Sequence, residues 1–154
     1  MINFFSLVTS LIVSLGTGVI SGVITREDTR NVFDSIQKAP LTPPSIVFPI
    51  VWTILFFLMG LGAYYVWESD CKYRRIGLSF YALQLVFNFF WSIIFFKFEQ
   101  FEIAFIWLIL LWLFVITMSV LFYQCSKKAG LLQIPYILWL TFAAYLNFAI
   151  VVLN

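Results

Sequence analysis

Five long apolar stretches, separated by short polar segments, dominate the chain. They cover residues 2–25, 43–67, 76–96, 101–123 and 131–153, and most charged residues lie between them. A helix rises ~1.5 Å per residue, so about 20 apolar residues cross the roughly 30 Å hydrocarbon core of a bilayer. The pattern therefore predicts an all-α integral membrane protein, a five transmembrane helix bundle that forms a single domain over residues 1–154.

The second stretch, residues 43–67, carries no charge and has the features of a cavity wall. Thr42 can cap its start, and Pro43 suits a first helical position, where a missing N–H costs nothing. Bulky rings give way to a small residue along one helical face. The residues on that face, at spacings of four, three and four, are Trp52, Phe56, Met59 and Ala63.

The third and fifth stretches also gather polar and aromatic side chains on one face. In the third these are Gln84, Asn88 and Trp91; in the fifth they are Tyr136, Trp139, Ala143 and Asn147. Amides buried in lipid need partners, so they either join helices by hydrogen bonds or orient a ligand in an apolar pocket. One residue can fill both roles, and both interpretations stay open.

The first stretch has a ridge of small residues, and a long connector follows it. Ser10, Ser14, Gly18 and Gly22 recur every fourth residue, which allows close approach by another helix of the same chain or of a second copy. The connector, residues 26–40, is long for a link between helices, and its charges sum to zero. Phe33 and Ile36 lie on one side of a short helical turn there, which favours a lid over the bundle.

Composition narrows the function classes. The chain is 63% hydrophobic and 10% charged, with a net charge of +2, no histidine and two cysteines. A dispersed charge of this size argues against nucleic-acid binding, and a zinc site or a histidine-based triad cannot be assembled. No metal and no required cofactor are expected.

The basic residues predict the orientation only weakly. Five Lys or Arg lie on the side of the N-terminus and four on the side of the long connector. The positive-inside rule then favours a cytoplasmic N-terminus and an outward-facing lid. The same orientation puts Cys71 and Cys125 on the reducing side, where we expect free thiols.

Three segments carry a resemblance to a known family. LTPPSIVFPIVWTILFFLMGLGAYYVW, LQLVFNFFWSIIFF and IPYILWLTFAAYLNFAIVVLN, in this order, resemble the TspO/MBR family of tryptophan-rich sensory proteins and translocator proteins, also called the peripheral benzodiazepine receptor family. The resemblance implies a five-helix bundle, usually a homodimer, whose cavity under the first loop binds porphyrins and, in some members, cholesterol and benzodiazepine-site ligands. The pocket residues that it implies are Trp52, Phe56, Asn88, Trp91, Trp139, Phe142, Ala143 and Leu146.

The chain departs from the family pattern in two places. Val32 and Phe33 stand where the family commonly has Trp-Tyr in the first loop. The sterol motif of the animal proteins lacks its tyrosine and its basic residue, since Phe148 follows Leu146 and no Lys or Arg comes after Lys128. The chain resembles a small bacterial member, and we expect it in the cell (plasma) membrane.

These observations lead to three functional hypotheses. The first is a sensory receptor that binds a porphyrin, heme or another tetrapyrrole in an aromatic cavity, with Gln84 or Asn88 fixing its orientation. The second is light-dependent degradation of the bound porphyrin, with Trp52 and Trp139 as electron donors at one ligand. The third is transport of a sterol or lipid; ion-coupled transport is disfavoured because no charged residue is embedded in a span.

Overall fold

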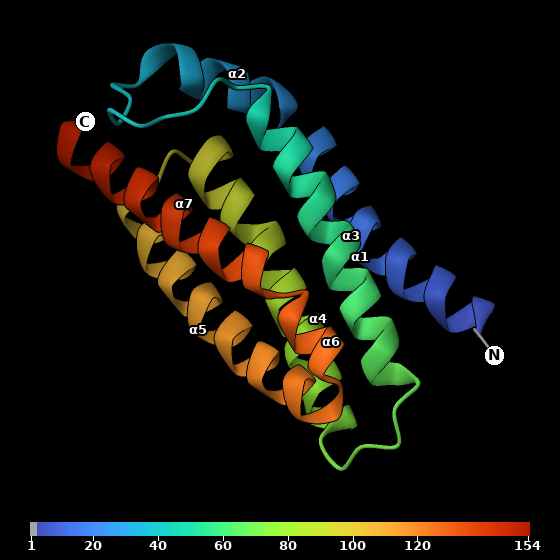
Figure 1. Ribbon diagram of the computed structural model, residues 1–154. Helices are drawn as coiled ribbons and strands as arrows, with labels where there is room; N and C mark the ends of the chain where they lie inside the picture. The colour runs from blue at the N-terminus through green and yellow to red at the C-terminus, as the bar shows by residue number, and fades with distance from the viewer. Residues whose placement is uncertain (1–2) are drawn as a thin grey trace.

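The computed structural model describes residues 3–154, and this part of the chain is built from helices without strands (Figure 1). The helices are α1 (Phe4–Ile24), α2 (Arg26–Ser35), α3 (Val47–Trp67), α4 (Arg74–Ser92), the π-helical turn η1 (Ile93–Lys97), α5 (Phe101–Cys125), α6 (Lys127–Leu131) and α7 (Ile134–Leu153). Five segments are long and apolar enough to cross a membrane, with α4–η1 and α6–α7 each counting as one. The predicted five-helix membrane bundle is confirmed.

The predicted starts of the first two long helices differ from those of α1 and α3. The first helix was predicted from Ile2, which lies outside the described residues. The second was predicted from Pro43 with Thr42 as its cap, but α3 begins at Val47 and Ile46 occupies the N-cap position. A residue that precedes proline is pushed towards extended backbone, so the Thr42-Pro43-Pro44 run delays the helix. The buried Thr42 hydroxyl therefore caps nothing and has no hydrogen-bond partner.

The long connector contains a true helix rather than a short helical turn. α2 follows α1 directly after Thr25 and lies across one end of the bundle, the end where α7 also finishes (Figure 1). Val32 anchors α2 to the bundle, with 1% of its surface exposed. Further along, the Asn154 side chain binds the backbone of Gln37 in the segment after α2. Asn154 Oδ1 accepts from the Gln37 N–H at 2.8 Å, and Asn154 Nδ2 donates to the Gln37 carbonyl oxygen at 3.1 Å.

The small-residue ridge of α1 packs within the chain. α1 lies mainly against α3. A Cβ placed on Gly60 of α3 would lie 2.5 Å from Ser14 Oγ, and a Cβ on Gly18 would lie 2.5 Å from the Phe56 ring. Tyr81 of α4 also donates a hydrogen bond to the Ser10 carbonyl oxygen, at 3.2 Å. Most of the ridge is therefore covered by its own bundle, and a homodimer would have to use another surface.

The prediction of free thiols was wrong. Cys71, in the α3–α4 link, and Cys125, at the end of α5, form a disulfide with a Cα–Cα distance of 5.3 Å. The sequence prediction placed both thiols in a reducing compartment on the basis of a one-residue difference in basic charge. Because disulfides persist in oxidising compartments, the cross-link favours the opposite orientation, with the α2 end of the bundle on the reducing side.

Candidate ligand-binding cavity

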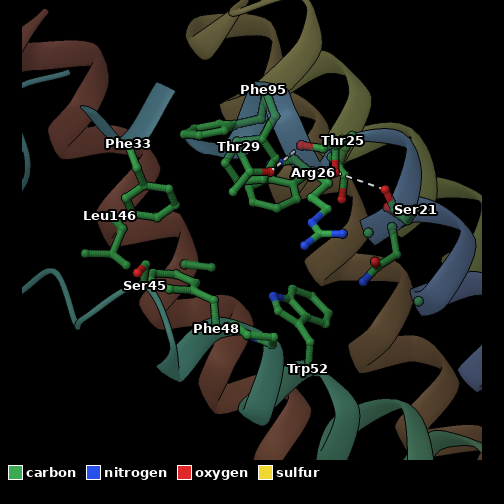
Figure 2. Close-up of a pocket in the computed structure, with 18 of the residues that line it drawn as sticks. Ser21, Thr25, Arg26, Thr29, Phe33, Ser45, Phe48, Trp52, Phe95 and Leu146 are labelled. Carbon is green, nitrogen blue, oxygen red and sulfur yellow. Dashed lines mark hydrogen bonds between the residues drawn. The ribbon is translucent and has the colours of Figure 1, made fainter. Parts of the chain in front are cut away.

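A cavity of about 630 Å³ lies beneath α2, between α1, α3, α4, η1 and α7. Seven aromatic rings line it: Phe33, Phe48, Trp52, Phe56, Trp91, Phe95 and Phe96. Figure 2 shows rings from opposite sides facing one interior space, with Phe95 and Phe33 near α2 and Trp52 on α3. Apolar pockets of ~300–1,000 Å³ with few polar groups are typical small-molecule sites.

The structure brings most of the predicted site residues together in this cavity. The lining includes Trp52, Phe56, Asn88, Trp91, Ala143 and Leu146, and the two lid residues Phe33 and Ile36. Gln84, Tyr136, Trp139 and Phe142 do not line it. The last four divide into two pairs with different surroundings.

Gln84 and Tyr136 form a buried polar floor below Asn88. The Tyr136 hydroxyl donates to Gln84 Oε1 at 2.8 Å and accepts from Asn88 Nδ2 at 2.9 Å. Gln84 and Tyr136 are only 0% and 1% exposed. Gln84 therefore joins helices, as one interpretation of the amides predicts, while Asn88 is held in place at the cavity surface, and its role in orienting a ligand stays a prediction. Because the Asn88 amide nitrogen donates to Tyr136, its Oδ1 remains as the acceptor that a ligand can use.

Trp139 and Phe142 face a second, shallower groove on the outside of the bundle. This groove, of about 380 Å³, lies between α3 and α7. The Phe48 ring contacts Trp139 edge-on, with a centroid distance of 5.8 Å, and itself lines the main cavity. Trp52 and Trp139 therefore do not meet in one cavity as expected, because Phe48 stands between Trp139 and the interior.

The lid residue Phe33 closes the cavity through aromatic contacts. Its ring stacks on Phe96 of η1 at 6.3 Å and meets Phe48 of α3 edge-on at 5.3 Å. Phe33 therefore bridges two walls, and it stands where the family commonly has the tyrosine of its Trp-Tyr pair.

Sequence reasoning left several lining residues out of the predicted pocket, although it placed Asn147 on the polar face of the fifth stretch. Asn147 lines the cavity, accepts a hydrogen bond from Trp91 Nε1 at 3.4 Å and donates from Nδ2 to the Phe101 carbonyl oxygen at 2.9 Å. Its spacing of four from Ala143 was the available signal. Arg26 and Arg30 also line the cavity, and both share a helical face with Phe33. Among residues 3–154, no three His, Cys, Asp or Glu side chains gather as metal ligands, so the cavity offers aromatic, amide and basic groups.

Comparison with known proteins agrees with this architecture. Residues 9–153 match the model of the TspO/MBR family. The chain is 36% identical to the tryptophan-rich protein TspO of Archaeoglobus fulgidus, over 99% of both chains, and 34% identical to the tryptophan-rich sensory protein of Cereibacter sphaeroides, over 97% of this chain and 92% of that protein. It is also 34% identical to the human translocator protein, over 89% and 82% of the two chains. The match across nearly the whole chain confirms the resemblance seen in its motifs: the chain belongs to the TspO/MBR family.

Proposed function

We propose that this membrane protein is a sensory receptor that binds a porphyrin in the cavity beneath α2. The observation that carries the proposal is the partly open aromatic cavity of about 630 Å³. Trp52 and Phe56 stand side by side on its wall, with a centroid distance of 5.6 Å, and offer ring faces to a flat aromatic ligand. Stacking adds about 0.5–1.5 kcal/mol per aromatic pair beyond the burial of area, and Asn88 supplies an orienting acceptor.

The distribution of charge supports binding over ion-coupled transport. α3 and α7 contain no Asp, Glu, Lys or Arg, and the charged residues of the other long spans lie at their ends. Ion-coupled transporters usually carry ionisable groups that face the interior of the bundle. The spans of this protein lack such groups, because the cations that line the cavity belong to residues 26–38 at its roof, so the bundle is better suited to hold a ligand than to move one against a gradient.

The proposal is tested by titrating the purified protein in nanodiscs with protoporphyrin, heme and cholesterol while tryptophan fluorescence is recorded. Saturable quenching by a tetrapyrrole is expected, and Trp52→Phe should remove a large part of the signal. Trp67→Phe is the matched control, because Trp67 ends the same helix outside the cavity. A cholesterol response without a tetrapyrrole response would instead support the sterol hypothesis.

Light-dependent degradation of the bound porphyrin is the second candidate function. Trp52 lines the cavity, and its ring meets that of Tyr136 edge-on at 6.1 Å, so an electron lost from the indole could be replaced from the phenol. Under illumination, Trp52→Phe should slow the decay of the porphyrin absorbance at saturating ligand, while Trp139→Phe should not, because Phe48 separates Trp139 from the cavity. Equal decay in both variants and the unmodified chain would end this hypothesis.

The remaining proposals concern location and assembly. We infer a multi-pass protein of the cell membrane that forms a homodimer through a surface other than the Ser10–Gly18 ridge. The mass of the protein in nanodiscs, compared between the unmodified chain and a variant that carries leucine at Gly16, tests the assembly; Gly16 has open space around its Cα. A dimer lost on substitution at Gly16 would place the interface on the face of α1 that carries Gly16, which is not part of the ridge.

A further inference from the structure

In α2 and the segment after it, the basic side chains line the cavity and the acidic side chains do not. Residues 26–38 contain three basic and three acidic side chains. The three basic residues, Arg26, Arg30 and Lys38, line the cavity; the three acidic residues, Glu27, Asp28 and Asp34, do not. A segment with no net charge therefore presents only positive charge to the cavity.

No acidic residue from any other element balances this charge. Every Asp and Glu is absent from the cavity lining, so its formal charge is that of the three cations. Figure 2 shows the Arg26 guanidinium extending into the cavity towards Trp52, while Arg26, Arg30 and Lys38 also remain exposed to solvent. Clefts that combine one sign of charge with apolar walls focus the electrostatic potential and concentrate ligands of the opposite sign.

Two further observations place polar groups beside these cations. Lys38 Nζ lies over the Phe33 ring, 5.7 Å from its centroid, which holds the ammonium group near the roof of the cavity. The buried Thr42 hydroxyl also lines the cavity and has no hydrogen-bond partner in the protein. Buried polar groups normally have a partner, so the unpaired Thr42 hydroxyl marks a polar position in the wall of the cavity that the protein itself does not satisfy.

We propose that Arg26, Arg30 and Lys38 form an anion subsite at the roof of the cavity. The subsite selects ligands that have a large apolar body and a negatively charged group at one edge: the body packs against Trp52 and Phe56, and the anion meets the cations of the lid. The charged group is a carboxylate of the ligand or the phosphate of a lipid headgroup. The inference rests on the proposed function, because it names the ligand class of the same cavity.

The test compares two ligands that differ only in charge. Protoporphyrin IX carries two carboxylates, and its dimethyl ester has the same ring without them. Both are titrated into the protein in phosphatidylcholine nanodiscs, with empty nanodiscs subtracting partition into lipid. We expect the acid to bind more tightly than the ester and its affinity to fall as salt is raised, because exposed charges are screened.

The variants are Arg26→Gln, Arg30→Gln and Lys38→Gln, with Arg75→Gln as the control. Arg75 is exposed at the start of α4, at the opposite end of the bundle, and does not line the cavity. Each lid variant should weaken binding of the acid about three- to tenfold, within the range of charge-assisted contacts that are partly open to water. Binding of the ester should not change in any variant, which also shows that the cavity stays folded.

The outcomes separate the subsite from the binding function itself. Equal affinities for acid and ester, unaffected by the lid variants, would overturn the subsite and leave porphyrin binding intact. Failure of both ligands to bind would overturn both proposals. In nanodiscs that contain phosphatidylglycerol, loss of the acid–ester difference supports the subsite with a lipid phosphate as its anion, and persistence of the difference supports it with the ligand carboxylate.

Discussion

Replacing Gly18 by alanine should push the neighbouring Phe56 ring into the cavity. A Cβ at this position would lie 2.5 Å from Cδ2 and Cε2 of Phe56 and 3.3 Å from its Cγ. Carbon atoms in contact lie ~3.5–4.0 Å apart, so the ring would have to retreat by about 1 Å or more. Phe56 is already 5% exposed and packs beside Trp52, which leaves the cavity as the open direction. Overpacking of this kind costs about 1–3 kcal/mol, which is ~5- to ~100-fold in the dissociation constant if the ligand must push the ring back.

Gly22→Ala is the matched control. Gly22 lines the same cavity one turn further along α1, but a Cβ there would meet nothing within 4 Å. This variant gains up to about 1 kcal/mol of helix propensity without a clash. Protoporphyrin titration and thermal unfolding are measured for both variants in nanodiscs. Equal ligand affinity for Gly18→Ala and Gly22→Ala would refute the placement of the ligand against Phe56.

Three other changes test the cavity, its lid and the opposite end of the bundle. Ala143→Leu adds bulk to the cavity lining and should weaken a bulky ligand by ~1–3 kcal/mol; equal porphyrin affinity by titration would place the ligand elsewhere. Phe33→Ala removes the ring that bridges two walls and should speed ligand release more than it slows entry, as measured by stopped-flow fluorescence; an unchanged release rate would reduce α2 to a connector. Replacing Cys71 and Cys125 by serine should lower the free energy of unfolding by up to about 4 kcal/mol, the loop-entropy value for a separation of 54 residues. Thermal unfolding with and without reductant checks this, and a reductant-insensitive midpoint in the unmodified chain would contradict it.

Periodicity along the helices predicted the spans and most of the cavity wall. The spacing of Trp52 and Phe56, and of Asn88 and Trp91, depends only on the helical repeat, which the tertiary structure does not alter. However, knowing that residues share one helical face does not show which side chain from another helix packs against that face. Trp139 lies only four residues before Ala143, yet Phe48 from another helix covers it from the cavity side.

Two features were missed because the sequence analysis did not consider which face of a helix a charge lies on or which loops the spans bring together. The charges of the long connector were summed to zero, although the helical spacing of Arg26, Arg30 and Phe33 already placed them on one face. The prediction of free thiols rested on a one-residue bias in basic charge, which says nothing about which loops meet. α5 runs through 25 residues and ends at Cys125, which brings that thiol to the α3–α4 link and to Cys71.

The floor and the roof of the cavity are built with different rigidity, and this difference divides their roles. The floor is held by the Gln84–Tyr136–Asn88 hydrogen bonds between α4 and α7, and a buried hydrogen-bonded network of this kind rigidifies its surroundings. The roof is held by the two small buried side chains of Val32 and Ala39, by the contacts of Phe33, and by the exposed hydrogen bonds between Asn154 and Gln37. Exposed hydrogen bonds and few buried contacts mark the segments that open first. Under the proposed function, the floor would fix which ring system fits, while the roof, which carries the cations, would set how quickly a ligand enters and leaves and which charged edge it must present.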